Sequence, residues 1–246
     1  MEANNFIIEI SKLNKSFGEN HVLRDFSMKL ERGENLVILG KSGSGKSVLI
    51  KCIIKLIEPD LGKIMVLDHD ISELDQDEMD LLRKDVGFLF QSNALYDSMT
   101  VRENLEFPLR RHWTVEQRES QAEEAVMEAL EDVGLSHTVN MMPSELSGGM
   151  RKRIALARTL ILKPQVILYD EPTTGLDPIT AREISELMIS IQKKYKASSV
   201  IISHDMNCIR MTSNRVITLI EGRNYVADTY DNLMKNTDPK VSEFFR

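Results

Sequence analysis

Short runs of apolar and β-branched residues alternate with stretches of helical periodicity along much of the chain. The runs that predict strands lie at residues 7–10, 36–39, 64–67, 86–90, 166–169, 200–202 and 216–220. Several of these runs are apolar at every position, which is typical of strands that are buried on both faces of a parallel sheet. The pattern predicts an α/β fold built on a mostly parallel sheet.

Two regions depart from this alternation. A turn signal at residues 221–224 follows the last apolar run and predicts a hairpin, so we expect an antiparallel portion of the β structure as well. Residues 92–162 carry no strand pattern, and residues 116–133 show helical spacing of apolar positions with charges on the other face. We therefore expect one domain over residues 1–246, with a helical subdomain inserted at 92–162 and a helical tail at 231–246.

The composition is that of a folded protein, and its charge balance is not that of a general nucleic-acid coat or of a purely electrostatic membrane binder. Hydrophobic residues make up 42% of the 246 positions and charged residues 28%, within the range of globular domains. The 31 Lys and Arg against 38 Asp and Glu leave a net charge of −7, which argues against a nucleic-acid partner. The beginning of the chain has no apolar core of a secretory signal, and no apolar run approaches the ~20 residues of a membrane span. Cys52 and Cys208 are too few and too far apart for a disulfide framework or a zinc cluster, which favours two reduced thiols.

The sequence GKSGSGKS at residues 40–47 fits the phosphate-binding pattern G-x-x-x-x-G-K-[ST]. It follows a predicted strand and precedes an apolar segment that can form a helix, so its glycines can turn backbone N–H groups toward phosphate oxygens at a helix N-terminus. Lys46 would reach the β- and γ-phosphates, and the Ser47 hydroxyl would ligate Mg²⁺. The residues predicted to bind ATP in this segment are Gly40, Lys41, Ser42, Gly43, Ser44, Gly45, Lys46, Ser47 and Val48.

A carboxylate pair ends the apolar run at residues 166–169. Asp170 and Glu171 come directly after this run, where a phosphoryl-transfer site needs acidic residues. Asp170 would hold Mg²⁺, directly or through water, and Glu171 would orient the attacking water or accept its proton. The alternative is a solvated pair at a strand end, which the neighbouring phosphate-loop pattern makes the weaker interpretation.

The motif LSGGM at residues 146–150 narrows the class of phosphate-loop protein. It is similar to the signature of ABC transporter ATPases, and further motifs of that family occur in the family's order over nearly the whole chain. The positions that resemble them are Phe17 and Val22 of the adenine-contacting loop, Gln91 of the Q-loop, Asp177 of the D-loop and His204 of the switch. Each of these motifs is weak alone, and together they are very specific.

The resemblance implies a fold, a set of cofactors and the roles of individual site residues. The implied fold is a phosphate-loop NTPase core with an inserted helical subdomain, the whole chain forming one ABC ATPase domain. The implied cofactors are ATP and Mg²⁺. The implied catalytic residues are Lys46, Glu171 and His204. The implied metal-binding residues are Ser47, Gln91 and Asp170.

The resemblance also implies partners. In this family the signature of one copy faces the nucleotide of a second copy, so Ser147, Gly148 and Gly149 are expected to act in trans and to close an ATP-sandwich dimer. An integral-membrane permease subunit binds the ATPase and follows its opening and closing. The segment after Gln91, with Tyr96, Met99, Phe107 and Leu109, lies where the family docks that subunit, and these side chains are expected either there or in the subdomain core.

A signature that ends in Gly-Gly-Met resembles a narrower group, the ATPases of Mla-type, MCE-associated phospholipid transporters. Met150 stands where most of the family has glutamine, and the segment DPIT at residues 177–180 also resembles that group. This implies a phospholipid moved between bacterial membranes, MCE-domain and small cytosolic auxiliary partners, and a cytoplasmic protein held on the inner membrane's cytoplasmic face. The aromatic pair Phe244 and Phe245 is expected either to pack on its own domain or to reach a neighbour.

Two other classes of function remain open at this stage. The first is a soluble ABC-type ATPase without a permease, such as an iron–sulfur assembly factor, which would be recovered with a soluble scaffold rather than with membranes. The second is a phosphate-loop kinase for a small molecule, which would leave residues 147–149 and His204 unexplained. The run of carboxylates at residues 68–80 lacks the glycine that a calcium loop needs and is expected to be a solvated loop leading into a helix.

Overall fold

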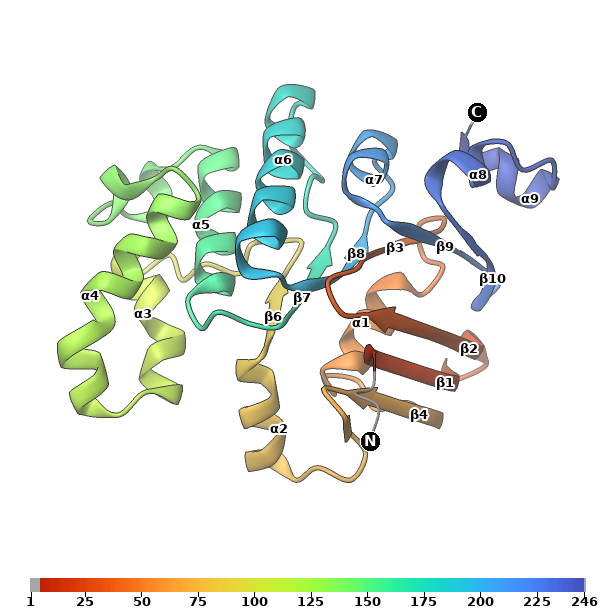
Figure 1. Cartoon of the computed structure of the whole chain (residues 1–246), viewed down its shortest axis with the longest axis horizontal. Helices are drawn as coiled ribbons and strands as arrows, with labels where there is room; N and C mark the ends of the chain where they lie inside the picture. Colours follow the sequence, from red (N-terminus) through yellow and green to blue (C-terminus); the bar gives the residue numbers. More distant parts are fainter. Residues whose placement is uncertain (1–4, 246) are drawn as a thin grey trace.

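The computed structural model describes residues 5–245, and the chain forms two sheets with helices packed around them (Figure 1). Residues 1–4, on which part of the secretory-signal prediction rests, and Arg246 at the end of the tail lie outside the described residues. The strands are β1 Phe6–Phe17, β2 Asn20–Glu31, β3 Asn35–Leu39, β4 Leu61–Val66, β5 His69–Asp70, β6 Val86–Leu89, β7 Val166–Asp170, β8 Ser198–Ile202, β9 Arg215–Ile220 and β10 Arg223–Asp228. The helices are α1 Lys46–Ile53, α2 Gln76–Lys84, α3 Val101–His112, α4 Val115–Asp132, α5 Gly148–Leu160, α6 Pro178–Tyr195, α7 Met206–Thr212, α8 Tyr230–Met234 and α9 Pro239–Ser242, with short 3₁₀ turns at Ser136–Thr138, Pro143–Glu145 and Glu243–Phe245.

The larger sheet has the strand order β10-β9-β3-β8-β7-β6, and its strands are parallel except for β10, which pairs antiparallel with β9. Every residue of β3, β7 and β8 is buried. Along β3, Leu36 and Ile38 face one hydrophobic cluster while Val37 and Leu39 face another, as successive side chains of a strand must. The predicted α/β fold, its parallel sheet and its hairpin at residues 221–224 are confirmed.

The smaller sheet is antiparallel, with the order β2-β1-β4-β5. Strand β2, which has 12 residues, was not predicted, and only the first third of β1 was. The signal was present, because Phe26, Met28 and Leu30 are buried and alternate with exposed polar residues. This sheet and α1 cover one face of the larger sheet and share its largest hydrophobic cluster.

Helices α3, α4 and α5 stand together at one end of the molecule, away from the antiparallel sheet (Figure 1). They surround a hydrophobic cluster of their own, whose central residues Leu105, Val126 and Ile154 come one from each helix. The predicted helix at residues 116–133 is α4, and no strand lies between residues 92 and 162. Leu109 belongs to this cluster and is fully buried, so of the two alternatives for this side chain the subdomain core is correct.

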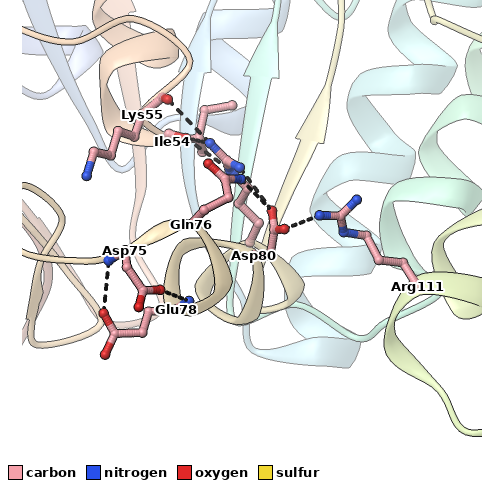
Figure 2. A network of polar contacts seen from close by, with 8 residues as sticks. Ile54, Lys55, Asp75, Gln76, Glu78, Asp80 and Arg111 are labelled. Atoms are coloured by element: carbon pink, nitrogen blue, oxygen red, sulfur yellow. Dashed lines mark hydrogen bonds and ion pairs between the residues drawn. The ribbon is translucent and has the colours of Figure 1, made fainter.

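A network of polar contacts joins this helical end to the rest of the chain (Figure 2). Asp80 on α2 accepts hydrogen bonds from Arg83, from Gln76 and from Arg111 of α3. The guanidinium of Arg83 also donates to the carbonyl of Ile54, with Nη2 at 3.0 Å, and thus caps the C-terminal end of α1. The helix that begins at the phosphate loop is therefore connected to α3 through two arginines and one carboxylate.

Other parts of the chain behave as their local sequence requires. Asp75 caps α2 and shares a capping box with Glu78, so the acidic run at residues 68–80 leads into a helix. Cys52 and Cys208 are free and buried. Among residues 5–245 we find no helix with the length and apolar character that crossing a membrane requires.

Candidate functional site

The carboxyl ends of the central parallel strands bring the predicted site residues to one edge of the larger sheet. The phosphate loop follows β3, His204 follows β8, and Gln91 follows β6, while Asp170 is the last residue of β7 and Glu171 comes directly after it. Because these strands are neighbours in the order β3-β8-β7-β6, residues more than 100 positions apart in sequence meet there. Ligands of open α/β sheets bind at this edge.

The phosphate loop curls tightly between β3 and α1. Gly43 and Gly45 have φ angles of 76° and 101°, in the left-handed region that favours glycine. At Gly45, the cap of α1, a Cβ atom would also lie 2.7 Å from Cγ1 of Val22, so both the conformation and the close approach exclude a larger residue. The loop therefore presents backbone N–H groups at the N-terminus of an eight-residue helix.

Lys46 is the first residue of α1 and only 7% exposed. Its Nζ donates to the carbonyl oxygens of Gly40, at 2.8 Å, and Lys41, at 3.0 Å. Burial lowers the pKa of the Lys46 ammonium, and the charges of Glu171 and Asp170 oppose that shift. The ammonium is thus held inside the phosphate loop, where it is predicted to bind phosphate oxygens.

Asp170 lies beside the other end of this loop. Its Oδ1 accepts a hydrogen bond from the Ser47 hydroxyl at 3.0 Å. Burial raises the pKa of the Asp170 carboxyl, and the Ser47 hydrogen bond partly offsets the shift. Carboxylate and hydroxyl oxygens are ligands that Mg²⁺ prefers, so this pair fits the predicted metal site.

Glu171 has an unusual backbone and well-defined side-chain partners. Its φ of 52° is rare for a residue other than glycine, and such outliers concentrate at functional sites. Its Oε2 accepts a hydrogen bond from Thr174 Oγ1 at 3.1 Å and lies 2.8 Å from Nδ1 of His204. The side chain of His204 is two-thirds exposed, so the imidazole joins a nearly buried carboxylate to solvent.

These residues line a cavity of about 700 Å³, large enough for a nucleotide. Its walls include most of the phosphate loop together with Gln91, Glu171 and His204, and Phe17 and Val22 lie along the same cavity. Phe17 is half exposed rather than packed in the core, so its ring face is available for stacking. Asp170 and Ser44 are not among the cavity-lining residues, although both lie next to residues that are.

The sequence analysis missed part of this cavity. Met206, Glu243 and Phe244 also line it, and Glu243 Oε1 lies 2.9 Å from Nζ of Lys41 in the phosphate loop. The C-terminal tail therefore folds back over the site, and Phe244 and Phe245 pack against their own domain. No local sequence signal could have shown this, because the two partners are about 200 residues apart.

The signature residues lie elsewhere. Ser147 caps α5, its Oγ accepting the N–H of Met150 at 3.2 Å, and Ser147 and Gly148 are exposed. A Cβ atom at Gly149 would lie 2.6 Å from Cγ2 of Thr180, so α5 and α6 approach closely here. Asp177 caps α6 through the N–H groups of Ile179 and Thr180. Residues 147–149 and Asp177 do not line the cavity of their own chain.

One buried polar atom in the loop supports a phosphate ligand. Within residues 5–245, the hydroxyl oxygen of Ser44 is buried and has no hydrogen-bond partner, a situation that native structures normally avoid. In the described part of the chain, the hydrogen bonds of the Lys46 ammonium go to two carbonyls of its own loop. A polyanion would supply acceptors for both groups, so the residues present fit a nucleoside triphosphate with Mg²⁺.

Comparisons with known proteins agree with this geometry. The family model described as ABC transporter matches residues 23–174. The Mycobacterium leprae (strain TN) protein named probable ribonucleotide transport ATP-binding protein mkl is 38% identical over 237 residues, which cover 96% of this chain and 68% of that protein. The Arabidopsis thaliana protein TRIGALACTOSYLDIACYLGLYCEROL 3, chloroplastic, is 37% identical over 254 residues, covering 97% of this chain and 73% of that protein.

A solved structure shares both the fold and the sequence pattern. It is the dimeric post-hydrolysis state of the ATP-binding cassette MJ0796 bound to ADP and Pi, with a TM-score of 0.80 and 30% identity over 91% of this chain and 98% of that one. The match of more than half of the chain to one family, together with these relatives, excludes the class of small-molecule kinases. The chain belongs to the ABC transporter family, as an ATP-hydrolysing subunit that uses ATP with Mg²⁺.

Proposed function

We propose that this chain is half of an ATP-sandwich dimer that drives a phospholipid permease. The observation that carries the proposal is the single cavity lined by the phosphate loop, Gln91, Glu171 and His204. Those groups supply an anion cradle, a carboxylate and an imidazole at one place, which is what phosphoryl transfer to water requires.

Within one chain, each of the gathered residues has a chemical role. Lys46 exchanges its bonds to Gly40 and Lys41 for the β- and γ-phosphate oxygens, and the N–H groups of the loop bind the same anion. Glu171 orients the attacking water and accepts its proton, while His204 holds the carboxylate and faces the terminal phosphate. Ser47, Asp170 and Gln91 would hold Mg²⁺, which neutralises charge on the phosphates when bound.

The second half of the site comes from another copy. Ser147 caps a 13-residue helix that begins with Gly148 and Gly149. Ser147 and Gly148 are exposed, and none of the three residues lines the cavity of its own chain. A helix N-terminus with a serine hydroxyl binds anions, so this turn suits the γ-phosphate held by a partner chain. Two ATP molecules would then join two copies head to tail, and hydrolysis would remove the shared charge that holds them together.

A permease subunit would dock on the helical end of the molecule. Tyr96 and Phe107 are both exposed, and their rings pack 4.7 Å apart with the Arg158 guanidinium 5.9 Å from the Tyr96 ring. Tyr96 precedes α3 and Phe107 lies within it, and such an exposed aromatic pair suits an apolar partner helix. We propose that residues 92–162 move as one subdomain during closure, and that the described part of the tail, residues 231–245, is a separate element folded over the core.

The phospholipid cargo is supported by sequence features and by one relative's name. The signature ends in Met150, and the segment at 177–180 reads DPIT, both of which resemble Mla-type ATPases. The Arabidopsis relative carries the name of a galactolipid, whereas the Mycobacterium leprae relative is named for ribonucleotide transport. On this proposal the partners are a polytopic permease, an MCE-domain protein and small auxiliary subunits, on the cytoplasmic face of a bacterial inner membrane.

The proposal is tested by purifying the complex from membranes in a gentle detergent. We expect a polytopic subunit and an MCE-domain protein to co-purify with the chain, and phospholipid to be enriched over a mock purification. Lys46→Ala should abolish ATP binding, whereas Ser147→Arg should spare binding to the monomer and block turnover. Recovery of the chain with a soluble scaffold only, or with a permease that retains nucleotides instead of lipid, would contradict the proposed phospholipid cargo.

A further inference from the structure

Two cations of α5 hold the loop that follows β6. Nζ of Lys152 donates to the backbone carbonyl of Gln91 at 3.0 Å. The guanidinium of Arg158, on the same helix, donates to the carbonyls of Asn93 at 3.0 Å and Ala94 at 2.8 Å. The side chains of one helix therefore bind three carbonyls of a loop whose first residue lines the nucleotide cavity.

This loop has a backbone shape that its own residues disfavour. Asn93 and Ala94 have φ angles of 66° and 52°, in the left-handed region, and neither is glycine. Such conformations persist only where the surroundings enforce them. The two hydrogen bonds from Arg158 hold the carbonyls of these two residues, and the hydrogen bond from Lys152 holds the carbonyl of Gln91 two residues earlier.

The lysine is hard to explain by packing alone. Lys152 is 1% exposed and ranks among the largest fully buried side chains of the chain. Burial lowers the pKa of its ammonium to about 8, and Asp170 opposes the shift. Among residues 5–245 the carbonyl of Gln91 accepts the hydrogen bond of this ammonium, and Asp170 acts on the ammonium through its charge without a hydrogen bond. A methionine would fill similar space without the cost of burying a charge.

The position of Lys152 on its helix suggests what the charge achieves. Helix α5 begins at Gly148 with Ser147 as its cap, so Lys152 lies about one helical turn beyond the signature residues. We propose that Lys152 is a positioning residue that fixes Gln91 relative to the signature turn at residues 147–149. Through this contact, nucleotide bound in a chain's own cavity sets the orientation of the signature turn that the chain presents to its partner. This inference rests on the proposed function, because it assigns Gln91 and residues 147–149 to two different nucleotides.

The proposal separates binding from turnover. The phosphate loop does not depend on Lys152, so ATP should still bind to a chain that lacks its ammonium. Closure of the dimer should fail, however, because the signature turn no longer follows the loop at residues 91–94. The loss should therefore fall on kcat and on dimer formation rather than on ATP affinity.

The experiment compares Lys152→Met with Lys152→Arg in the full chain. Lys193→Met, at an exposed lysine of α6, is the matched control and should behave as the unmodified protein. For Lys152→Met we expect a Tm at or above that of the unmodified protein, an ATP Kd within about twofold, and a kcat lower by about tenfold or more. In the Glu171→Gln background the ATP-dependent dimer should be lost, and Lys152→Arg should recover most of both activities.

A measurement that needs no variant follows hydrogen exchange with increasing ATP and Mg²⁺. We expect protection of residues 91–94 and of the first turn of α5 to rise with the same ATP dependence. Protection of one without the other overturns the proposal, as does a Lys152→Met chain that turns over within about twofold of the unmodified protein. A joint fall of Tm, affinity and kcat in Lys152→Met, without recovery in Lys152→Arg, also overturns it, because that pattern is a packing defect.

Failure of the inference is distinguishable from failure of the proposed function. If Glu171→Gln is inactive and forms an ATP-dependent dimer while Lys152→Met turns over normally, only the role of Lys152 is wrong. If Glu171→Gln itself turns over normally, the proposed function fails, whatever Lys152→Met shows.

Discussion

Nδ1 of His204 lies 2.8 Å from Oε2 of Glu171, although the two residues follow different strands of the sheet. The same carboxylate oxygen accepts a hydrogen bond from Thr174, and the N–H of Glu171 donates to the carbonyl of Ile202 at 2.9 Å. The carbonyl of Ile202 thus holds the backbone of Glu171, while the side chains of His204 and Thr174 hold its carboxylate. This arrangement orients the carboxylate at the cavity.

Replacing Glu171 by glutamine should stop turnover and preserve binding. The amide keeps the shape of the side chain but cannot accept a proton from water, so we expect kcat to fall by about 100-fold or more. ATP binding should be unchanged, and an ATP-bound dimer should accumulate in size-exclusion chromatography. Glu116→Gln, on an exposed part of α4, serves as the control and should leave turnover intact. Normal hydrolysis by Glu171→Gln would remove Glu171 from the assigned role.

His204→Ala should lower activity without lowering stability. The side chain is two-thirds exposed, so its removal creates no cavity in the core, and the Tm should change little. Glu171 would lose one of the partners that orient its carboxylate, and we expect kcat to fall by about tenfold or more. The measurement is steady-state ATPase activity beside thermal unfolding. A variant that loses stability in proportion to activity would show that His204 serves the fold.

Much of the site could be predicted because its residues sit at the ends of strands with clear sequence signals. The all-apolar runs before Gly40, Asp170 and His204 predict buried parallel strands, and such strands place the following residues at one edge. Gln91 follows the same rule. The structure accordingly brings these four positions together.

The elements and contacts that were not predicted have a weak local pattern or depend on tertiary structure. Strand β2 alternates polar and apolar residues on a half-exposed sheet, a weaker signal than a continuous apolar run. The contact between Glu243 and Lys41 joins the chain's end to the phosphate loop and has no local signature. Lys152 is different, since it lies at helical spacing from the buried Leu156 and Leu160. A lysine in that apolar stripe is unusual, so its special role could have been suspected from the sequence.

The contacts around Asp80 make a prediction about stability. Arg83 donates to the carbonyls of Ile54 and Lys55, which lie at the C-terminal end of α1, and also to Asp80. Arg83→Met leaves partly buried carbonyls without donors and should reduce the free energy of unfolding by about 1–3 kcal/mol in urea denaturation.

Arg111→Met is the matched comparison, because it removes the other arginine of the same carboxylate (Figure 2). The Arg111 side chain is mostly exposed and caps no helix, so its loss should leave the unfolding midpoint nearly unchanged. Equal destabilisation by the two variants would show that the ion pairs with Asp80 outweigh the cap of α1.

The two cysteines should not react in the folded protein. Both are free and buried, and burial raises the pKa of the Cys52 thiol to about 11. At pH 8 about one Cys52 thiol in a thousand is then ionised, and the thiolate is the reactive form. A thiol reagent at pH 8 should label neither residue in the native state and both after denaturation. Fast labelling of the native chain would show that the cores around α1 or α7 open readily.

The most direct test of the account joins the phosphate loop of one copy to the signature of another. Ser42 and Ser147 are both exposed, so Ser42→Cys and Ser147→Cys can be made separately in the Glu171→Gln background and the two chains mixed under oxidising conditions. Glu119→Cys, on the exposed face of α4, replaces Ser147→Cys in the control mixture. We predict a disulfide-linked dimer of Ser42→Cys with Ser147→Cys that forms with ATP and Mg²⁺, is weak with ADP and is absent from the control. A yield that does not depend on ATP, or no cross-link between these positions, would contradict the sandwich of nucleotide between two copies.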